Sequence, residues 1–143
     1  MKKMIDELLE TRYHVIDILP EQVPADSSGN YFAIEKYFLD KRRFAAVKRK
    51  HIDIVLKLNC YTAVSLEDED AVNPPPSAIA RAMRERHTCI RVGNALIVSE
   101  PDDTCLTLYN APDRLLALAA QLAAAEGLFL WQPKQDRREC DRI

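Results

Sequence analysis

Two residues with metal-binding or nucleophilic side chains lie close together in the sequence, His87 and Cys89. On a strand their side chains would share one face. The remaining histidines and cysteines each stand alone: His14, His51, Cys60, Cys105 and Cys140. A structural zinc site needs two closely spaced pairs, so a single pair predicts no metal site. We interpret His87 as the end of a helix and Cys89, like Cys105, as a small buried side chain.

Motifs of nucleophilic catalysis are missing from the sequence. There is no Gly-x-Ser-x-Gly elbow, and no cysteine adjoins a glycine-rich turn that would hold an oxyanion. The chain has three glycines, so glycine-rich phosphate loops are missing as well. A set such as Cys60, His51 and Asp53 could assemble in space, but most chains of this length offer one. The sequence therefore favours a protein that is not an enzyme and needs no cofactor.

Charged side chains gather in clusters. The acidic runs at 67–70 and 102–103 lack the glycine and the alternating oxygens of a calcium loop, which indicates solvated loops. Six basic residues form the densest cluster: Lys41, Arg42, Arg43, Lys48, Arg49 and Lys50. Such a density suits contact with phosphates or with a partner protein. The net charge of −2 favours a solvated or protein-facing helix surface.

The elements that must position these residues are short helices and strands in mixed order. Apolar spacing and capping residues predict helices over 3–12, from 31 onward, over 41–58, over 78–87 with Ser77 as its cap, and over the segment that Asn110 caps and Gly127 ends. Alternating or β-branched segments predict strands at 13–19, 60–66, 88–92, 95–100, 104–109 and 128–132. Residues 52–58 fit both patterns, and the length of the helical pattern favours a helix.

The order of these elements predicts an α+β fold. Strands 88–92 and 95–100, joined by a tight turn at Gly93–Asn94, form an antiparallel meander with strand 104–109. We expect a two-layer domain in which this meander and the closing strand 128–132 form a sheet, with the helices packed mainly on one face. Residues 1–133 are expected to form a single domain. The polar segment 134–143 is expected to be a disordered tail.

The apolar segments are too short to predict a signal peptide or a membrane span. Acidic residues interrupt the first ten residues, and the longest apolar stretch, 115–125, falls well short of the about 20 residues that a span needs. The sequence therefore predicts a cytoplasmic protein that does not enter the membrane. In that compartment the four cysteines would be reduced.

Three functions remain compatible with these features. The leading hypothesis is a non-enzymatic protein-interaction or regulatory module, because charge is segregated into a basic helix and acidic loops that suit docking to a complementary protein. The first alternative is a nucleic-acid-associated protein that uses residues 41–51. The second is a small-molecule-binding domain or small enzyme with a pocket between helix and sheet, close to four residues: Tyr13, His14, Tyr37 and Trp131.

Overall fold

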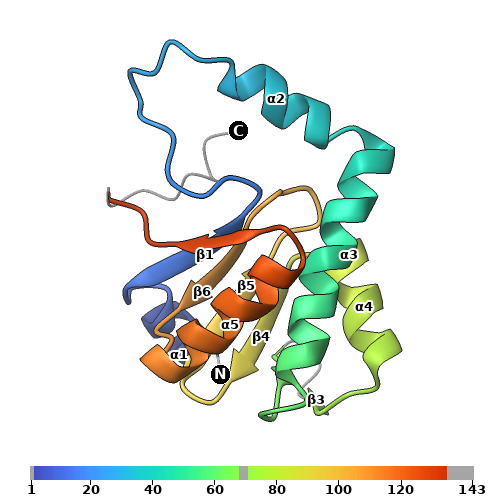
Figure 1. The fold of residues 1–143 in the computed structure, drawn as a ribbon. Coiled ribbons are helices and arrows are strands. Elements are labelled where there is room, and N and C mark those ends of the chain that lie inside the picture. Colours follow the sequence, from blue (N-terminus) through green and yellow to red (C-terminus); the bar gives the residue numbers. More distant parts are fainter. Residues whose placement is uncertain (1, 68–70, 135–143) are drawn as a thin grey trace.

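Seven strands form one antiparallel sheet in a computed structural model that describes residues 2–67 and 71–134 (Figure 1). The strands are β1 (Tyr13–Asp17), β2 (Ser65–Leu66), β3 (Ala71–Val72), β4 (Thr88–Val92), β5 (Ala95–Ser99), β6 (Leu106–Tyr109) and β7 (Phe129–Trp131). Their order across the sheet is β3-β2-β4-β5-β6-β1-β7. The strand nearest the N-terminus therefore lies between the last two strands of the chain.

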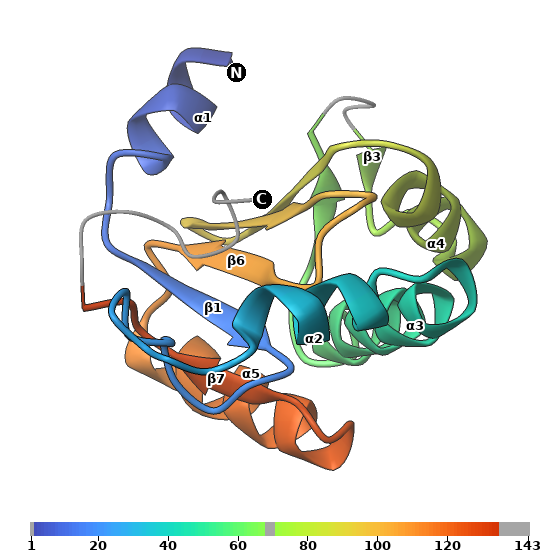
Figure 2. The ribbon, with the colours of Figure 1, turned by 90° about the horizontal axis from the view of Figure 1, so that it is seen from above.

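Five helices accompany the sheet in the described residues: α1 (Lys2–Leu8), α2 (Tyr31–Phe38), α3 (Lys41–Leu58), α4 (Pro76–Glu85) and α5 (Asp113–Ala125). Helices α3, α4 and α5 cover one face, and α3 lies between the other two (Figures 1 and 2). Helix α1 lies on the opposite face (Figure 2). Helix α2 precedes α3 and lies beyond the end of the sheet (Figure 1). The predicted α+β class, with helices mainly on one face of an antiparallel sheet, is confirmed.

The main core fills the space between the sheet and helices α3, α4 and α5. Helix α3 buries Ile54, Val55 and Leu58 there, which confirms that the ambiguous segment 52–58 is helical. A smaller apolar cluster beneath α1 contains Leu8 and Leu96. Strand β5 is thus covered on both faces, which explains why its sequence is continuously apolar rather than alternating.

The hairpin of β4 and β5 has the tight turn that the sequence predicts. Val92 pairs with Ala95, and Gly93 adopts a φ of 60°, a left-handed conformation that a two-residue turn needs and that glycine adopts without strain. Gly127 likewise has a φ of 77° immediately after α5, where it ends the helix as expected.

The expected strand at 60–66 is reduced to its last two residues, Ser65 and Leu66. The amides of Tyr61 and Thr62 both donate to the carbonyl oxygen of Leu58, so the chain continues to wind after α3 instead of extending. Here the carbonyl groups at the helix end override the β propensity of the segment. The side chain of Asn73 then fixes the segment by accepting a hydrogen bond from the amide of Val64 at 3.1 Å.

Among the other boundaries that differ from the prediction, three have a local cause in the structure. Helix α4 begins at Pro76 with Pro75 in the capping position, so Ser77 lies inside the first turn instead of capping it. Asn110 does not cap α5, because it takes a φ of 55° and donates its side-chain amide to the carbonyl oxygen of Asn94. Strand β6 begins at Leu106 because Asp103 accepts the amide of Cys105 and turns the chain before it.

The cysteines are not all reduced. Cys105 is buried, as expected, but it is disulfide-bonded, so the prediction of a reduced thiol is wrong at this position. Cys60 and Cys89 are not disulfide-bonded. Cys140 and the predicted disordered tail, apart from Lys134, lie outside the described residues.

The lengths of the helices bear on the membrane prediction. None of the helices within residues 2–67 and 71–134 combines the length and the apolar character needed to cross a bilayer.

Candidate functional site

The six basic residues of the predicted cluster all lie on α3, but they do not share one surface. Lys41, Arg42, Arg43 and Arg49 are exposed and Lys50 is half-buried, whereas Lys48 is only 3% exposed. Arg43 is occupied locally, since it pairs with Asp40 at 3.0 Å and its guanidinium lies 3.7 Å from the ring centre of Tyr37.

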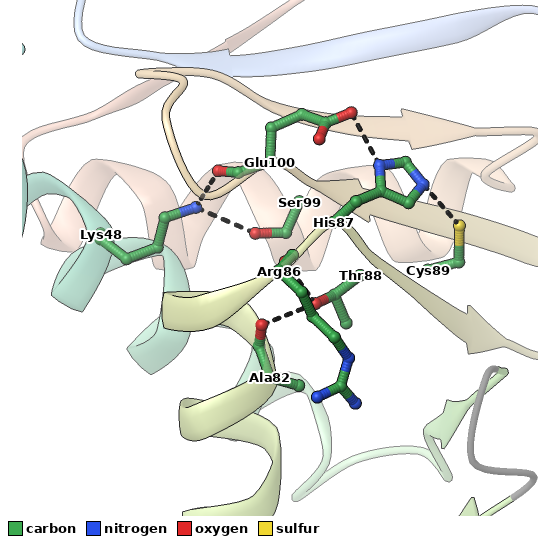
Figure 3. Close-up of polar contacts among 8 residues, drawn as sticks. All are labelled: Lys48, Ala82, Arg86, His87, Thr88, Cys89, Ser99 and Glu100. Carbon is green, nitrogen blue, oxygen red and sulfur yellow. Dashed lines mark hydrogen bonds and ion pairs between the residues drawn. The ribbon is translucent and has the colours of Figure 1, made fainter.

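Lys48 is placed too deeply to contact a phosphate or a partner, contrary to its predicted role. Its Nζ donates to Ser99 Oγ at 3.0 Å and to the carbonyl oxygen of Glu100 at 2.6 Å (Figure 3). Burial lowers the pKa of Lys48 to about 8, and nearby carboxylates, Asp103 first, partly oppose this change. The side chain therefore anchors α3 to the chain segment that leaves β5.

His51, one turn further along α3, is fully buried beside Lys48. Burial, reinforced by the charge of Lys48, lowers the pKa of His51 to about 3, while the backbone of Thr104 opposes the shift. The imidazole is therefore neutral at physiological pH. Such a ring forms part of the core rather than of a cationic surface.

The structure does not gather the four residues proposed for a pocket between helix and sheet. Tyr13 and Trp131 pack around Val15 and Cys105. His14, the next residue after Tyr13 on β1, points to the opposite face. Tyr37 is exposed on α2. None of the four lines either of the two pockets described next.

The larger pocket, of about 720 Å³, opens near the start of α5 and the turn between β4 and β5. Two guanidinium groups, from Arg12 and Arg114, contribute to its wall together with apolar side chains such as Leu115 and Leu118. Arg12 also donates to the carbonyl oxygen of Ala111 at 3.2 Å, which ties the start of β1 to the segment before α5. The wall of the pocket thus combines apolar side chains with two cationic ones.

The smaller pocket, of about 240 Å³, lies beneath α2 and contains two buried carboxyl groups, Asp17 and Glu35. Tyr31 donates its hydroxyl to Glu35 Oε2 at 2.9 Å. Burial, the largest cause, together with the charge of Glu35 raises the pKa of Asp17 to about 6, while the Ile18 amide opposes this rise by donating to Asp17. Two buried carboxyl groups therefore line the same pocket beneath α2, and the charge of Glu35 disfavours ionisation of Asp17.

Helix α2 has its polar and apolar sides partly reversed relative to an ordinary surface helix, because a glutamate is buried between the half-buried Tyr31 and Phe38 while other large apolar side chains are exposed. Its one buried residue is Glu35, which is 5% exposed, whereas Phe32, Ile34 and Tyr37 are 66%, 44% and 52% exposed. An amphipathic helix normally turns its apolar stripe to the core and its charges to water. This reversal leaves an apolar surface beside the basic start of α3.

His87, Cys89 and Glu100 form a continuous polar cluster at the end of the β4–β5 hairpin (Figure 3). His87 Nδ1 lies 2.8 Å from Glu100 Oε2, and His87 Nε2 lies 3.5 Å from Cys89 Sγ. A thiol, an imidazole and a carboxylate in this order are the components of an activated nucleophile. No group of three or more His, Cys, Asp or Glu side chains in the described ranges is arranged to hold a metal ion.

The sequence pairs His87 with Cys89 by spacing, but the prediction leaves out Glu100. The register of the predicted hairpin would have placed Glu100 beside His87. With Val92 opposite Ala95, continuing the antiparallel register places residue 87 opposite residue 100. The predicted turn at Gly93–Asn94 would therefore have brought Glu100 to His87.

Comparison of the chain with protein-family models, with curated proteins and with solved structures found no match.

Proposed function

We propose that the protein is a non-enzymatic interaction module that binds an acidic, apolar-faced segment of a partner protein. The binding surface, here called the α2–α3 surface, consists of Phe32, Ile34, Lys36, Tyr37, Lys41 and Arg42. The observation that carries the proposal is the reversal of α2, which exposes three large apolar side chains and buries a glutamate.

Apolar burial supplies the driving force for docking. Full burial of a side chain the size of Phe or Ile contributes about 1.5–3 kcal/mol, so three such residues leave a large free energy unused while they face water. Isolated exposed apolar residues are common, but several on one short helix mark an interaction site. Aromatic side chains are also the anchors that protein interfaces favour.

The basic side chains of the α2–α3 surface indicate an acidic partner. Lys36, Lys41 and Arg42 are exposed and form no ion pair with another residue of the described ranges. Carboxylates of a partner would complement these cations and orient the apolar contact. A nucleic acid fits less well, because the net charge of the chain is −2 and provides no overall attraction to phosphates.

Fluorescence polarisation with labelled probes tests the proposal. The first probe is an amphipathic helical peptide with Leu and Phe on one face and Glu on its flanks, and the second is the same peptide with Lys in place of Glu. A mixed-sequence single-stranded oligonucleotide is the third. We expect saturable binding of the acidic peptide alone, weakened at least about thirtyfold when Phe32 and Tyr37 are both changed to alanine, since interface anchors typically contribute more than about 1 kcal/mol each.

The variant Tyr61→Ala is the matched control, because Tyr61 is an aromatic residue that is 72% exposed and lies beyond the other end of α3. It should bind the acidic peptide as the unchanged protein does. Equal binding of both peptides, or an equal loss in the Tyr61 control, would contradict the proposal. Salt-sensitive oligonucleotide binding that Lys41→Gln and Arg42→Gln abolish would instead assign the surface to nucleic acid.

A further inference from the structure

The cluster of His87, Cys89 and Glu100 is independent of the α2–α3 surface. The contact of Nδ1 with Glu100, at 2.8 Å, fixes the imidazole tautomer whose proton points to the carboxylate. Nε2 then presents its lone pair to Cys89 Sγ at 3.5 Å. The ring can accept the thiol proton, and Glu100 stabilises the imidazolium that results.

Buried contacts hold two of these residues in place. Lys48 Nζ binds the carbonyl oxygen of Glu100, which fixes the backbone from which the carboxylate projects (Figure 3). Thr88 Oγ1 lies 2.9 Å from the carbonyl oxygens of both Ala82 and Arg86, and so ties the end of α4 to β4 on either side of His87. These hydrogen bonds thus hold the backbone segments that carry the imidazole and the carboxylate.

Cys89 lies on the face of the sheet that α1 covers. It packs at the border of the apolar cluster that contains Ile5, Leu8 and Val98, and it remains half-buried. Arg91 follows two residues later on the same face, 4.0 Å from Glu67, and is the nearest cation along the strand. The thiol therefore has an apolar wall on one side and an accessible imidazole, whose side chain is 58% exposed, on the other.

The position of Cys89 within a strand selects the type of reaction. Acyl transfer through a tetrahedral intermediate requires backbone N–H groups aimed at an oxyanion. Strand β4 is paired with β2 on one side and β5 on the other, and the Cys89 carbonyl itself accepts the Glu67 amide. Thiol–disulfide exchange has no such requirement, because the charge stays on sulfur throughout.

We infer that Cys89 is a reactive thiol, activated by His87 and with Glu100 as a positioning residue, that exchanges with small-molecule disulfides. The thiol proton passes to His87 Nε2, and the Cys89 thiolate attacks one sulfur of the disulfide. A new S–S bond forms as the original S–S bond breaks. The departing thiolate takes the proton from the imidazolium, so Cys89 is oxidised to a mixed disulfide and the other half of the reagent is reduced to a thiol.

Cys60 provides an internal comparison, because it is an exposed thiol whose sulfur contacts the Leu56 carbonyl oxygen at 3.8 Å. The experiment measures the rate of reaction with dithiobis(nitrobenzoate), without prior reduction, in Cys60→Ser and Cys89→Ser proteins. Peptide mass mapping identifies the modified cysteine. Oxidised glutathione then tests whether a biological disulfide forms the same adduct.

We expect Cys89 to react at least about threefold faster than Cys60 near pH 7, because a larger thiolate fraction outweighs its lower intrinsic nucleophilicity. Between about pH 7 and 8 the Cys89 rate should change little. The Cys60 rate should rise more steeply over the same range.

His87→Gln should give Cys89 the pH profile of Cys60, and Glu100→Gln should give an intermediate profile. Thermal melting of each variant establishes that it is folded. Equal rates and equal pH profiles for the two cysteines would overturn the inference. So would a His87→Gln protein in which the Cys89 profile is unchanged.

Discussion

Three buried ionisable residues near α3 and the base of α2 respond to pH in different directions. Burial raises the pKa of Asp17 to about 6, and lowers the pKa of Lys48 to about 8 and that of His51 to about 3. As the pH rises from about 4 to 6, Asp17 ionises in the unfolded chain before it does in the folded protein, so its contribution to stability falls. Over the same range His51 is largely protonated in the unfolded chain but neutral in the fold, so its contribution to stability rises with pH.

The variant Asp17→Asn separates these opposing effects. The rise in the pKa of Asp17 from 3.8 to about 6 corresponds to roughly 3 kcal/mol of destabilisation near pH 7, at about 1.4 kcal/mol per pKa unit. Asparagine keeps the oxygen that accepts the Ile18 amide but carries no charge toward Glu35. We expect the variant to be more stable near pH 7, by up to that amount, and unchanged below about pH 4. Urea unfolding at both pH values measures the difference.

Asp26→Asn is the control for this measurement, because Asp26 is an exposed carboxylate in the same loop region. It should leave the free energy of unfolding unchanged at both pH values. If Asp17→Asn destabilises the protein near pH 7, or stabilises it equally at both pH values, burial beneath α2 does not raise the pKa of Asp17.

At the residue scale the sequence contains more information about Lys48 than its charge suggests. Lys48, Ile52 and Val55 follow the i, i+4, i+7 spacing of one helix face, and all three are buried. Counting lysine as a surface residue hides this pattern. The partners that make its burial tolerable, Ser99 and the Glu100 carbonyl, lie about fifty residues away and cannot be inferred from local spacing.

At the scale of elements, long patterns are predictable and short ones are not. The bounds of α3, at Lys41–Leu58, agree with the sequence prediction because five turns of apolar spacing determine them. The predicted strand at 60–66 fails because hydrogen bonds to the end of α3 dominate its first residues. The orientation of α2 is also hidden, because its spacing predicts an apolar side facing inward, whereas Glu35 is the residue that is buried.

The packing of helix α5 against the sheet can be tested by substitution. Ala119 is fully buried against the sheet, whereas Leu118 is half-buried at the wall of the larger pocket. Ala119→Asp places an unpaired carboxylate in the main core, which costs several kcal/mol and is comparable with the total stability of a domain. We expect Ala119→Asp to be unfolded by circular dichroism at room temperature. Leu118→Asp should remain folded with a lower melting temperature, since its carboxylate can reach water.

The same pair tests how closely α5 packs on the sheet. An alanine-rich helix can approach a sheet closely only if its small residues form the contact, as Ala119 and Ala123 do. If Leu118→Asp proves the more damaging variant, the helix is rotated about its axis relative to the arrangement described.

At the scale of the whole molecule, the order of the strands joins segments that are distant in the sequence. Strand β1 lies between β6 and β7, and β2 pairs with β4, so both sides of the central meander combine strands from the two halves of the chain. The sequence predicts the meander of β4, β5 and β6 from its turns. It contains no comparable signal for the insertion of β1, because that pairing depends on contacts across about ninety residues.

This interleaving predicts that the protein unfolds in one cooperative step, despite the three consecutive prolines at 74–76 that divide its sequence. Trp131 is the only tryptophan and lies buried on β7 at one edge of the sheet. Helix α4, by contrast, packs on α3 away from that edge and contributes to the circular dichroism signal. Urea unfolding followed by Trp131 fluorescence and by circular dichroism should give coincident transitions.

A chain ending at residue 72 should be unfolded, since it lacks the partners of β1. Separate transitions, or a folded fragment, would mean that the two halves are independent domains.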